Sequence, residues 1–366
     1  MVLPVSPNSS ASRALPWRAR GLFMHSFASF RRFALGISPD ETKFARRGFS
    51  AADPIVQQHL EVAGGSFITG YNTALAEPRP GELAARLDER NDLFRGFAFE
   101  GAAMALALLD LLTPWNRGRF RALCDSPAGE RHWYLLFVGA GWAIARVPWA
   151  RRNFERTMGR YDPLYRWLAL DGYGFHEGFF HARQYVEQRQ SPRRLSDHAR
   201  RVFDQGLGRS LWFSHGGDAA RLAATIECFA PPRRADLWSG VGLGSGYAGG
   251  VDRAGLEQVL NAAAGYEPQL AQGAAFAAKA RQRAGNPVPH TALACKVYCR
   301  MSPEEAAAIT DNCLENLATG DADAAEPAYQ IWRRRIHERF TTAAPRGRIE
   351  TGAAVPPRPI LKSARQ

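Results

Sequence analysis

The chain has 366 residues, 46% of them hydrophobic, and its 9 Trp, 10 Tyr and 21 Phe exclude a disordered protein. The formal net charge of +12 lies at the two ends: residues 1–47 hold eight basic and two acidic side chains, residues 332–366 hold nine and two, and the body between them is nearly neutral. A nucleic-acid-binding protein would need a basic stripe on its folded body, so we expect no nucleic-acid partner. The basic ends leave peripheral contact with an anionic membrane open.

The cysteines point to the cytoplasm. Five of them are scattered along the chain and no secretory signal pattern precedes them, which predicts reduced thiols in a cytoplasmic protein. The longest uncharged apolar run, residues 133–145, is too short to span a bilayer, so we expect no transmembrane segment. Cys295 and Cys299 lie four residues apart, but no CxxC motif or close histidine pair completes a zinc set. No phosphate loop, haem attachment motif or nucleophile elbow occurs either, so the sequence predicts no metal and no cofactor.

The chain begins with a loose segment. We expect residues 1–23 to be disordered and residues 24–54 to form an aromatic and basic segment that packs on the body through Phe44. Within it, Ser38 and Pro39 precede two acidic residues, which is the pattern of a capped helix start.

From about residue 54 the pattern is helical. Candidate helices span residues 57–76, 81–90, 93–112 and 135–147. Alternating strand patterns bounded by hairpin turns are absent, so the predicted class is all-α. Residues 244–249 satisfy GxGxxG, but no βαβ context surrounds them, which excludes a dinucleotide site. Arg333 to Arg335 suggest a frayed helix, and residues 341–366 a disordered basic tail.

An internal repeat divides the body. Three pairs of segments match in order: residues 67–70 with 203–206, 93–104 with 237–248, and 139–143 with 273–277. Their offsets predict a duplication, with one helical unit over residues 55–190 and a second over residues 191–340. Glycine-containing helices recur every 30–40 residues, about the length of one helix pair. We therefore predict a tandem array of helical hairpins, a tetratricopeptide-like α-solenoid.

The stretch from Asp171 to His181 gathers glycines, aromatics and ionisable side chains. On a helix, His176 would share a face with Phe180, and Glu177 would share one with His181. Two interpretations stay open: a buried polar network satisfied by its neighbours, or the wall of a ligand pocket with His176 and Glu177 as catalytic acid and base. The pattern HExxxH is one residue too long for a zinc protease motif, because five residues turn the second histidine off the first one's face.

If a pocket exists, the aromatic residues near these glycines suit a long apolar ligand. Its candidate lining residues are Glu100, Trp142, Phe175, Phe179, Phe180, His181, Arg209 and Trp212. The alternative for Arg209 and Trp212 is ordinary core packing, with the arginine stem lying along apolar neighbours.

Several segments together resemble the UnbL-type family, bacterial proteins of undefined activity encoded in enediyne antibiotic clusters and in other settings. They are FRRFALGISP (30–39), FARRGF (44–49), GFAFEG (96–101), LDGYGFHEG (170–178), FDQGLGRSLW (203–212) and ADLWSGVG (235–242). The resemblance implies a role beside the iterative polyketide synthase that makes a linear polyene and the companion proteins that process it. This family has no established catalytic residues to carry over.

Two functional hypotheses follow. In the first, the protein is an accessory protein that binds or helps to process a hydrophobic polyene intermediate together with other enediyne-pathway proteins, which predicts a sizeable apolar pocket reaching His176. In the second, it is a non-catalytic helical-repeat scaffold for protein partners, which predicts a filled interior around His176 and exposed apolar patches elsewhere. Whether the chain is an enzyme stays open at this point.

Overall fold

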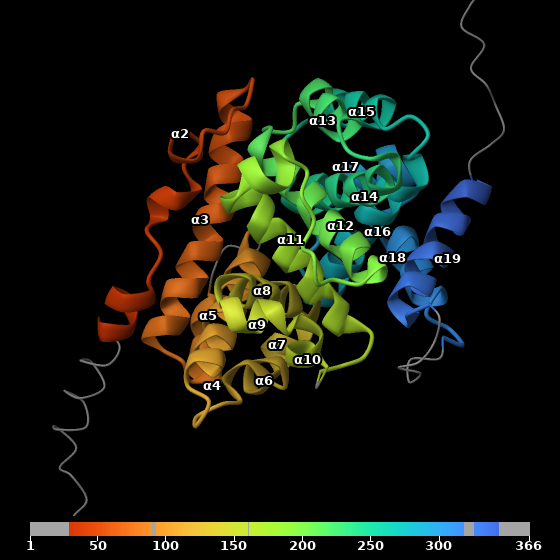
Figure 1. Cartoon of the computed structure of the whole chain (residues 1–366). Coiled ribbons are helices and arrows are strands. Elements are labelled where there is room, and N and C mark those ends of the chain that lie inside the picture. The colour runs from red at the N-terminus through yellow and green to blue at the C-terminus, as the bar shows by residue number, and fades with distance from the viewer. Residues whose placement is uncertain (1–28, 90–92, 160, 318–325, 344–366) are drawn as a thin grey trace, which may run out of the picture.

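The structure is a computed structural model that describes residues 29–89, 93–159, 161–317 and 326–343, and every regular element in these ranges is a helix (Figure 1). The prediction of an all-α protein is therefore confirmed. None of the helices in the described ranges is long and apolar enough to cross a membrane. The predicted disordered segment 1–23 and residues 344–366 of the predicted tail lie outside the described residues.

In the described ranges, seven helices of at least 13 residues pack in a row and form the body, and we call them the long helices. The remaining helices connect them or, like α19, lie at the edge of the row (Figure 1). The long helices are α3 (Pro54–Ala76), α5 (Arg95–Leu112), α8 (Trp133–Arg146), α11 (Leu168–Phe180), α12 (Asp197–Ser214), α14 (Pro231–Ala248) and α16 (Glu267–Ala284). The connecting and terminal ones are η1 (Pro39–Thr42), α2 (Phe44–Arg47), α4 (Pro80–Asp88), α6 (Arg119–Cys124), α7 (Pro127–Arg131), α9 (Pro148–Arg152), α10 (Phe154–Met158), η2 (Tyr165–Trp167), η3 (Arg183–Glu187), α13 (Ala219–Glu227), α15 (Arg253–Ala262), α17 (Pro289–Ala294), η4 (Cys295–Cys299), α18 (Pro303–Asn312) and α19 (Ala328–Ala343). Prolines open many of them, since a first-turn proline loses no helical hydrogen bond.

Each long helix packs against the next long helix along the chain, with glycines at the points of contact. A Cβ atom at Gly174 of α11 would lie 1.9 Å from the carbonyl oxygen of Phe203 in α12, and one at Gly206 would lie 1.8 Å from that of Asp171. Only glycine permits this backbone approach. Equivalent contacts between successive long helices occur at Gly70, Gly101, Gly139, Gly141, Gly172, Gly208, Gly240, Gly242 and Gly273. In α8, α11, α12 and α14 the motif is therefore Gly-x-Gly, with one glycine toward each neighbour.

The row of long helices curls, so that its first member, α3, reaches the end of α14, and its last member, α16, reaches the chain just before α5. Nε2 of His59 in α3 lies 2.6 Å from the carbonyl oxygen of Ala248 at the end of α14. Arg281 of α16 donates a 3.0 Å hydrogen bond to the carbonyl oxygen of Leu93, just before α5. Figure 1 shows the short helices α13 and α15 side by side at one end of the molecule and α19 at its edge. The curl gives the row an inner face, which carries the site described below.

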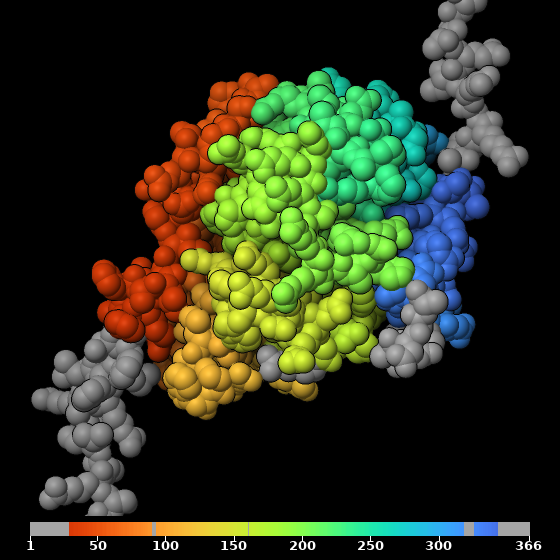
Figure 2. Space-filling view, viewed as in Figure 1, coloured from red at the N-terminus to blue at the C-terminus, as the bar shows by residue number. Residues whose placement is uncertain are grey.

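The N-terminal segment, residues 29–49, lies against α3 at the edge of the body opposite the blue helix α19 (Figure 2). As expected, Ser38 accepts a hydrogen bond from the backbone of Asp40, although the helix that it caps, η1, is only a 3-10 turn. Phe44 is buried, and its backbone N–H donates to Oε1 of Glu61 in α3 at 2.9 Å. The segment is thus fastened to α3 by polar contacts as well as by an aromatic side chain.

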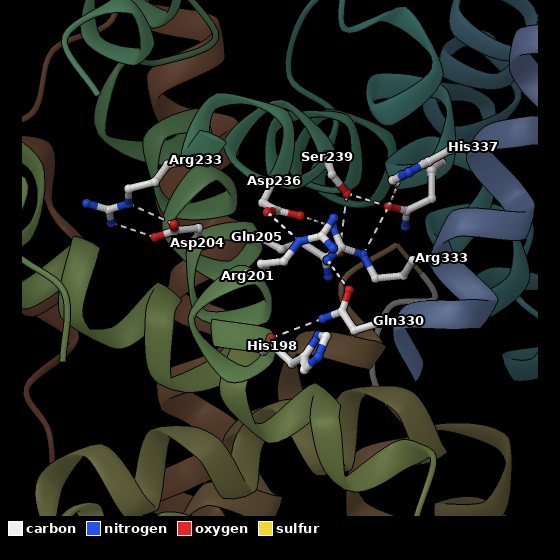
Figure 3. A network of polar contacts seen from close by, with 11 residues as sticks. His198, Arg201, Asp204, Gln205, Arg233, Asp236, Ser239, Gln330, Arg333 and His337 are labelled. Carbon is white, nitrogen blue, oxygen red and sulfur yellow. Dashed lines mark hydrogen bonds and ion pairs between the residues drawn. The ribbon is translucent and has the colours of Figure 1, made fainter. Parts of the chain in front are cut away.

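At the other edge, the expectation of a frayed helix at Arg333–Arg335 is wrong. Helix α19 is regular, and the Arg333 side chain, 1% exposed, makes a 2.7 Å ion pair with Asp236 of α14 (Figure 3). Gln330 also donates a hydrogen bond to the carbonyl oxygen of His198 in α12. Because Asp236 is almost fully buried, an arginine beside it offsets the cost of burying its charge, and α19 is held by this partner.

Candidate functional site

Six of the predicted lining residues surround one small cavity on the inner face of the helix row. They are Glu100, Trp142, Phe175, Phe179, Phe180 and Arg209. The N-terminal segment covers this aromatic cavity with Ile37, Glu41, Thr42 and Phe44, which also line it. The aromatic rings pack closely: Trp142 lies 5.0 Å from Phe175 between ring centroids, and Phe175 lies 5.9 Å from Phe179.

The aromatic cavity has a volume of about 40 Å³. A single water needs roughly 10–15 Å³ on this measure, so the cavity holds a few small groups and not a long chain. A longer ligand would require the covering segment to move. Trp212 lies elsewhere: it is fully buried, and its Nε1 donates a 2.9 Å hydrogen bond to the carbonyl oxygen of Gly249.

One end of the aromatic cavity is charged. Nη2 of Arg209 lies 2.8 Å from a carboxylate oxygen of Asp171 and 3.6 Å from one of Glu100, and the guanidinium stacks 4.6 Å from the Phe175 ring centroid. All three charged side chains are buried. Burial raises the pKa of Glu100 to about 7, against the opposing effect of Arg209. Near neutral pH this buried acid is therefore poised between its two protonation states.

Arg209 also lines a second cavity of about 40 Å³ on its other side. Leu243, Tyr247, Phe276 and Trp332 form much of its wall. Sequence analysis did not identify this cavity. The spacing from the glycines could have revealed it. In each of the helices α11, α12, α14 and α16, the residue three positions after the first glycine lies on the same face of the row; these residues are Phe175, Arg209, Leu243 and Phe276.

A larger, open groove lies on the far side of Phe180. Its volume is about 530 Å³, and its polar lining includes Ser38, Arg146, Arg151, His176 and His181. Phe180, Ile37 and Glu41 border both the groove and the aromatic cavity, so these side chains form the wall between them. The apolar pocket predicted by the first hypothesis thus does not reach His176; a polar groove does.

His176, Glu177 and His181 form a cluster at this groove, which we call the groove triad. Nδ1 of His176 lies 3.2 Å from one carboxylate oxygen of Glu177, and Nδ1 of His181 lies 2.9 Å from the other. Burial raises the pKa of Glu177, but its hydrogen bonds to the two histidines outweigh burial and bring the pKa to about 2. The hydrogen bond to Glu177 raises the pKa of His181, whereas burial lowers that of His176.

On a continuous helix, His176 and His181 would point in different directions because they are five residues apart, yet in the structure their side chains lie close together. The reason is that α11 ends at Phe180: His181 has φ −127° and ψ 39°, so it no longer follows the helical path. Among the described residues, these three side chains are also the group of His, Cys, Asp and Glu whose ligand atoms come within 4.8 Å of one another. The groove triad can therefore transfer protons or bind a metal ion.

Comparison with known proteins yields a family and no further relatives. No curated protein and no solved structure shows significant similarity to the chain. A family model described as "Protein of unknown function (DUF1702)" matches residues 26–340, which include the aromatic cavity, the groove triad and α19 up to Phe340. The chain therefore belongs to the DUF1702 family of proteins of unknown function.

Proposed function

We propose that this protein is an accessory protein of enediyne-type polyketide biosynthesis that binds or helps to process a hydrophobic polyene intermediate. One observation carries the proposal: segments that resemble the UnbL-type family converge on the aromatic cavity. They contribute Ile37, Phe44, Phe97, Glu100, Phe175 and Arg209 to its lining. A wall of aromatic rings with one charged end suits a conjugated apolar chain that carries a polar terminus.

The groove supplies the chemical side of the proposal. His176 lines the groove behind Phe180, one side chain away from the aromatic cavity, and the buried Glu177 lies 3.2 Å from its Nδ1. A polyene held along the aromatic wall with its reacting end in the groove would meet His176, which can move protons there with Glu177 as its hydrogen-bond partner. Such a ligand must displace part of residues 37–44, because they cover the cavity.

Metabolite profiling by mass spectrometry tests this function in the producing host. The strains carry the wild-type protein, a gene deletion, the double variant His176→Ala/Glu177→Ala, or the control His215→Ala, whose side chain contacts Ser214 and Thr225 away from the groove. We expect a polyene to accumulate in the deletion and in the double variant, provided the variant is folded, but not in the control. An unchanged profile in the deletion strain would refute the pathway assignment.

A scaffold role is the second candidate, and exposed apolar side chains favour it. Phe33 is 90% exposed, Trp115 82% and Ile55 75%. Exposed apolar side chains mark a contact site for another protein where they gather in one contiguous patch, whereas single ones are ordinary on a protein surface. In the same profiling experiment, a double variant that behaves like the wild type while the deletion does not would support this role over direct processing.

We also propose a cytoplasmic location, partner proteins from the same pathway, and an origin of the helix row by internal duplication of tandem helical hairpins. The glycine contacts support an internal duplication. Gly139 in α8 and Gly273 in α16 occupy matching positions of the repeat, and at each one the helix backbone packs closely against the preceding long helix. Co-purification of the full chain with other pathway proteins from cytoplasmic extract tests the first two points.

A further inference from the structure

The groove triad has the composition of a metal site. Two imidazoles and one carboxylate are the protein ligands of catalytic zinc centres and of non-haem iron centres, and both leave coordination positions open for other ligands. Here all three ligands come from residues 176–181, at the end of a single helix. The site therefore needs no convergence of distant segments.

The spacing of the ligand atoms fits a transition-metal ion. Ligands bound at about 2.0–2.1 Å lie about 2.8–3.0 Å from their neighbours in octahedral geometry and about 3.3–3.4 Å in tetrahedral geometry. The two His–Glu separations in the groove triad, each to a different oxygen of Glu177, are 3.2 and 2.9 Å, and one ligand atom from each of the three residues lies within 4.8 Å of the other two.

The surroundings hold two ligands in place and leave the third side open. The side chains of His176 and Glu177 are 6% and 1% exposed, whereas that of His181 is 49% exposed. The rings of Trp142 and Phe180 pack against His176, with centroids 5.6 and 5.0 Å away. A bound ion would thus have protein on one side and the 530 Å³ groove on the other.

From this geometry we propose that His176, Glu177 and His181 bind one first-row divalent transition-metal ion, of the Fe²⁺ or Zn²⁺ class, with open coordination positions facing the groove. This goes beyond the proposed function and does not depend on it. Arg146 and Arg151 line the same groove and repel a cation. However, the Glu177 carboxylate beside both histidines brings one negative charge to a bound ion, which offsets part of this repulsion.

The test uses the untagged full chain, stripped with a chelator and titrated with Co²⁺, whose visible absorption reports the ligand set. The variants are Glu177→Gln and His181→Gln. The matched control is His215→Gln, because His215 caps the C-terminal end of α12 as His181 caps that of α11. Circular dichroism checks the fold of each variant.

We expect one Co²⁺ per chain and a visible spectrum of nitrogen and oxygen ligation in the wild type and the control. In both triad variants the affinity should fall by at least the roughly 10–100-fold that loss of an outer-shell partner costs a metal site. Wild-type binding no tighter than that of the triad variants would overturn the proposal. If Glu177→Gln does not fold, His181→Gln decides, since its side chain is half exposed. No polyene is present, so failure here leaves the proposed function untouched.

Discussion

Helix α11 contributes a carboxylate to each of two polar clusters, and their surroundings differ. Asp171, fully buried, faces Arg209 and Glu100 in the interior. Glu177, six residues further along, faces two histidines, one of which is half exposed at the groove. The inner cluster has a fixed cation and is closed to solvent, so it organises the core. The groove triad is open on one side, so it can exchange protons or ions with solutes.

The largest expected effect comes from the inner cluster. Arg209→Ala leaves Asp171 buried without its cation, which should lower the free energy of unfolding by about 3–5 kcal/mol. Urea unfolding followed by circular dichroism measures the loss. As a control, Arg253→Ala removes an exposed pair with Glu257 and should cost under about 1 kcal/mol. Equal losses in the two variants would mean that the inner cluster does not stabilise the core as described.

Glu100→Gln tests the protonation of the inner cluster. Burial raises the pKa of Glu100 to about 7 in the folded state, above its ordinary value, so the folded protein binds the proton more tightly than the unfolded chain. The stability that this proton contributes is complete below about pH 4.5 and is lost as the pH rises through 7. As the pH rises from about 4.5 to above 7, the free energy of unfolding of the wild type should therefore fall by up to roughly 3 kcal/mol relative to that of the variant. Parallel unfolding curves of the two proteins from pH 4 to 8 provide the measurement.

Glu177→Gln should show the opposite pH dependence of stability: in chelator-treated protein, the wild type should lose stability relative to this variant as the pH falls. The folded-state pKa of Glu177, about 2, lies below its ordinary value. Its contribution is therefore present above about pH 4.5 and is lost as the pH falls toward 2. We expect a difference of up to about 2 kcal/mol, less than for Glu100, because solvent screens the pair with His181. If the stability difference between wild type and variant changed with pH in the same direction for Glu100→Gln and Glu177→Gln, the contrast between the two clusters would be contradicted.

His181→Gln should have the smallest effect on stability, under about 1 kcal/mol, because its side chain is half exposed. The pKa of His181 is raised by Glu177, so its contribution is complete at pH values below that of a free histidine and disappears as the pH rises past the raised value. Thermal unfolding at pH 5 and pH 9 measures this difference, which should appear only at pH 5. A larger loss at pH 9 would show that His181 acts through packing.

Local patterns in the sequence predicted much of the fold. The capped start at Ser38 and Pro39 and the four candidate helices between residues 57 and 147 depend on nearby residues only, and the structure has counterparts of them all. The aromatic lining was also predictable, because glycines and large rings in one helix indicate close neighbours. The close approach of helices explains why so many glycines lie at similar intervals.

Features that depend on distant residues were missed. Arg333 and Asp236 are 97 residues apart, and nothing local to either one reveals that they pair. The groove triad was discounted by helical periodicity because the exact end of α11 decides it, and helix ends are poorly encoded in local sequence. The cover over the aromatic cavity likewise depends on how the N-terminal segment folds back onto α3.

The glycine contacts between the long helices restrict how a ligand could enter. Backbones that touch so closely have no side chains between them that could rotate aside, so the helix row would act as a rigid wall. The N-terminal segment is attached differently, through side chains such as Lys43 on Glu61 and Arg47 against Phe180, and such contacts re-form easily. A ligand could then enter the interior only while residues 37–47 are detached from the rest of the protein. The rate at which this segment detaches would therefore limit the rate at which any interior ligand binds or leaves.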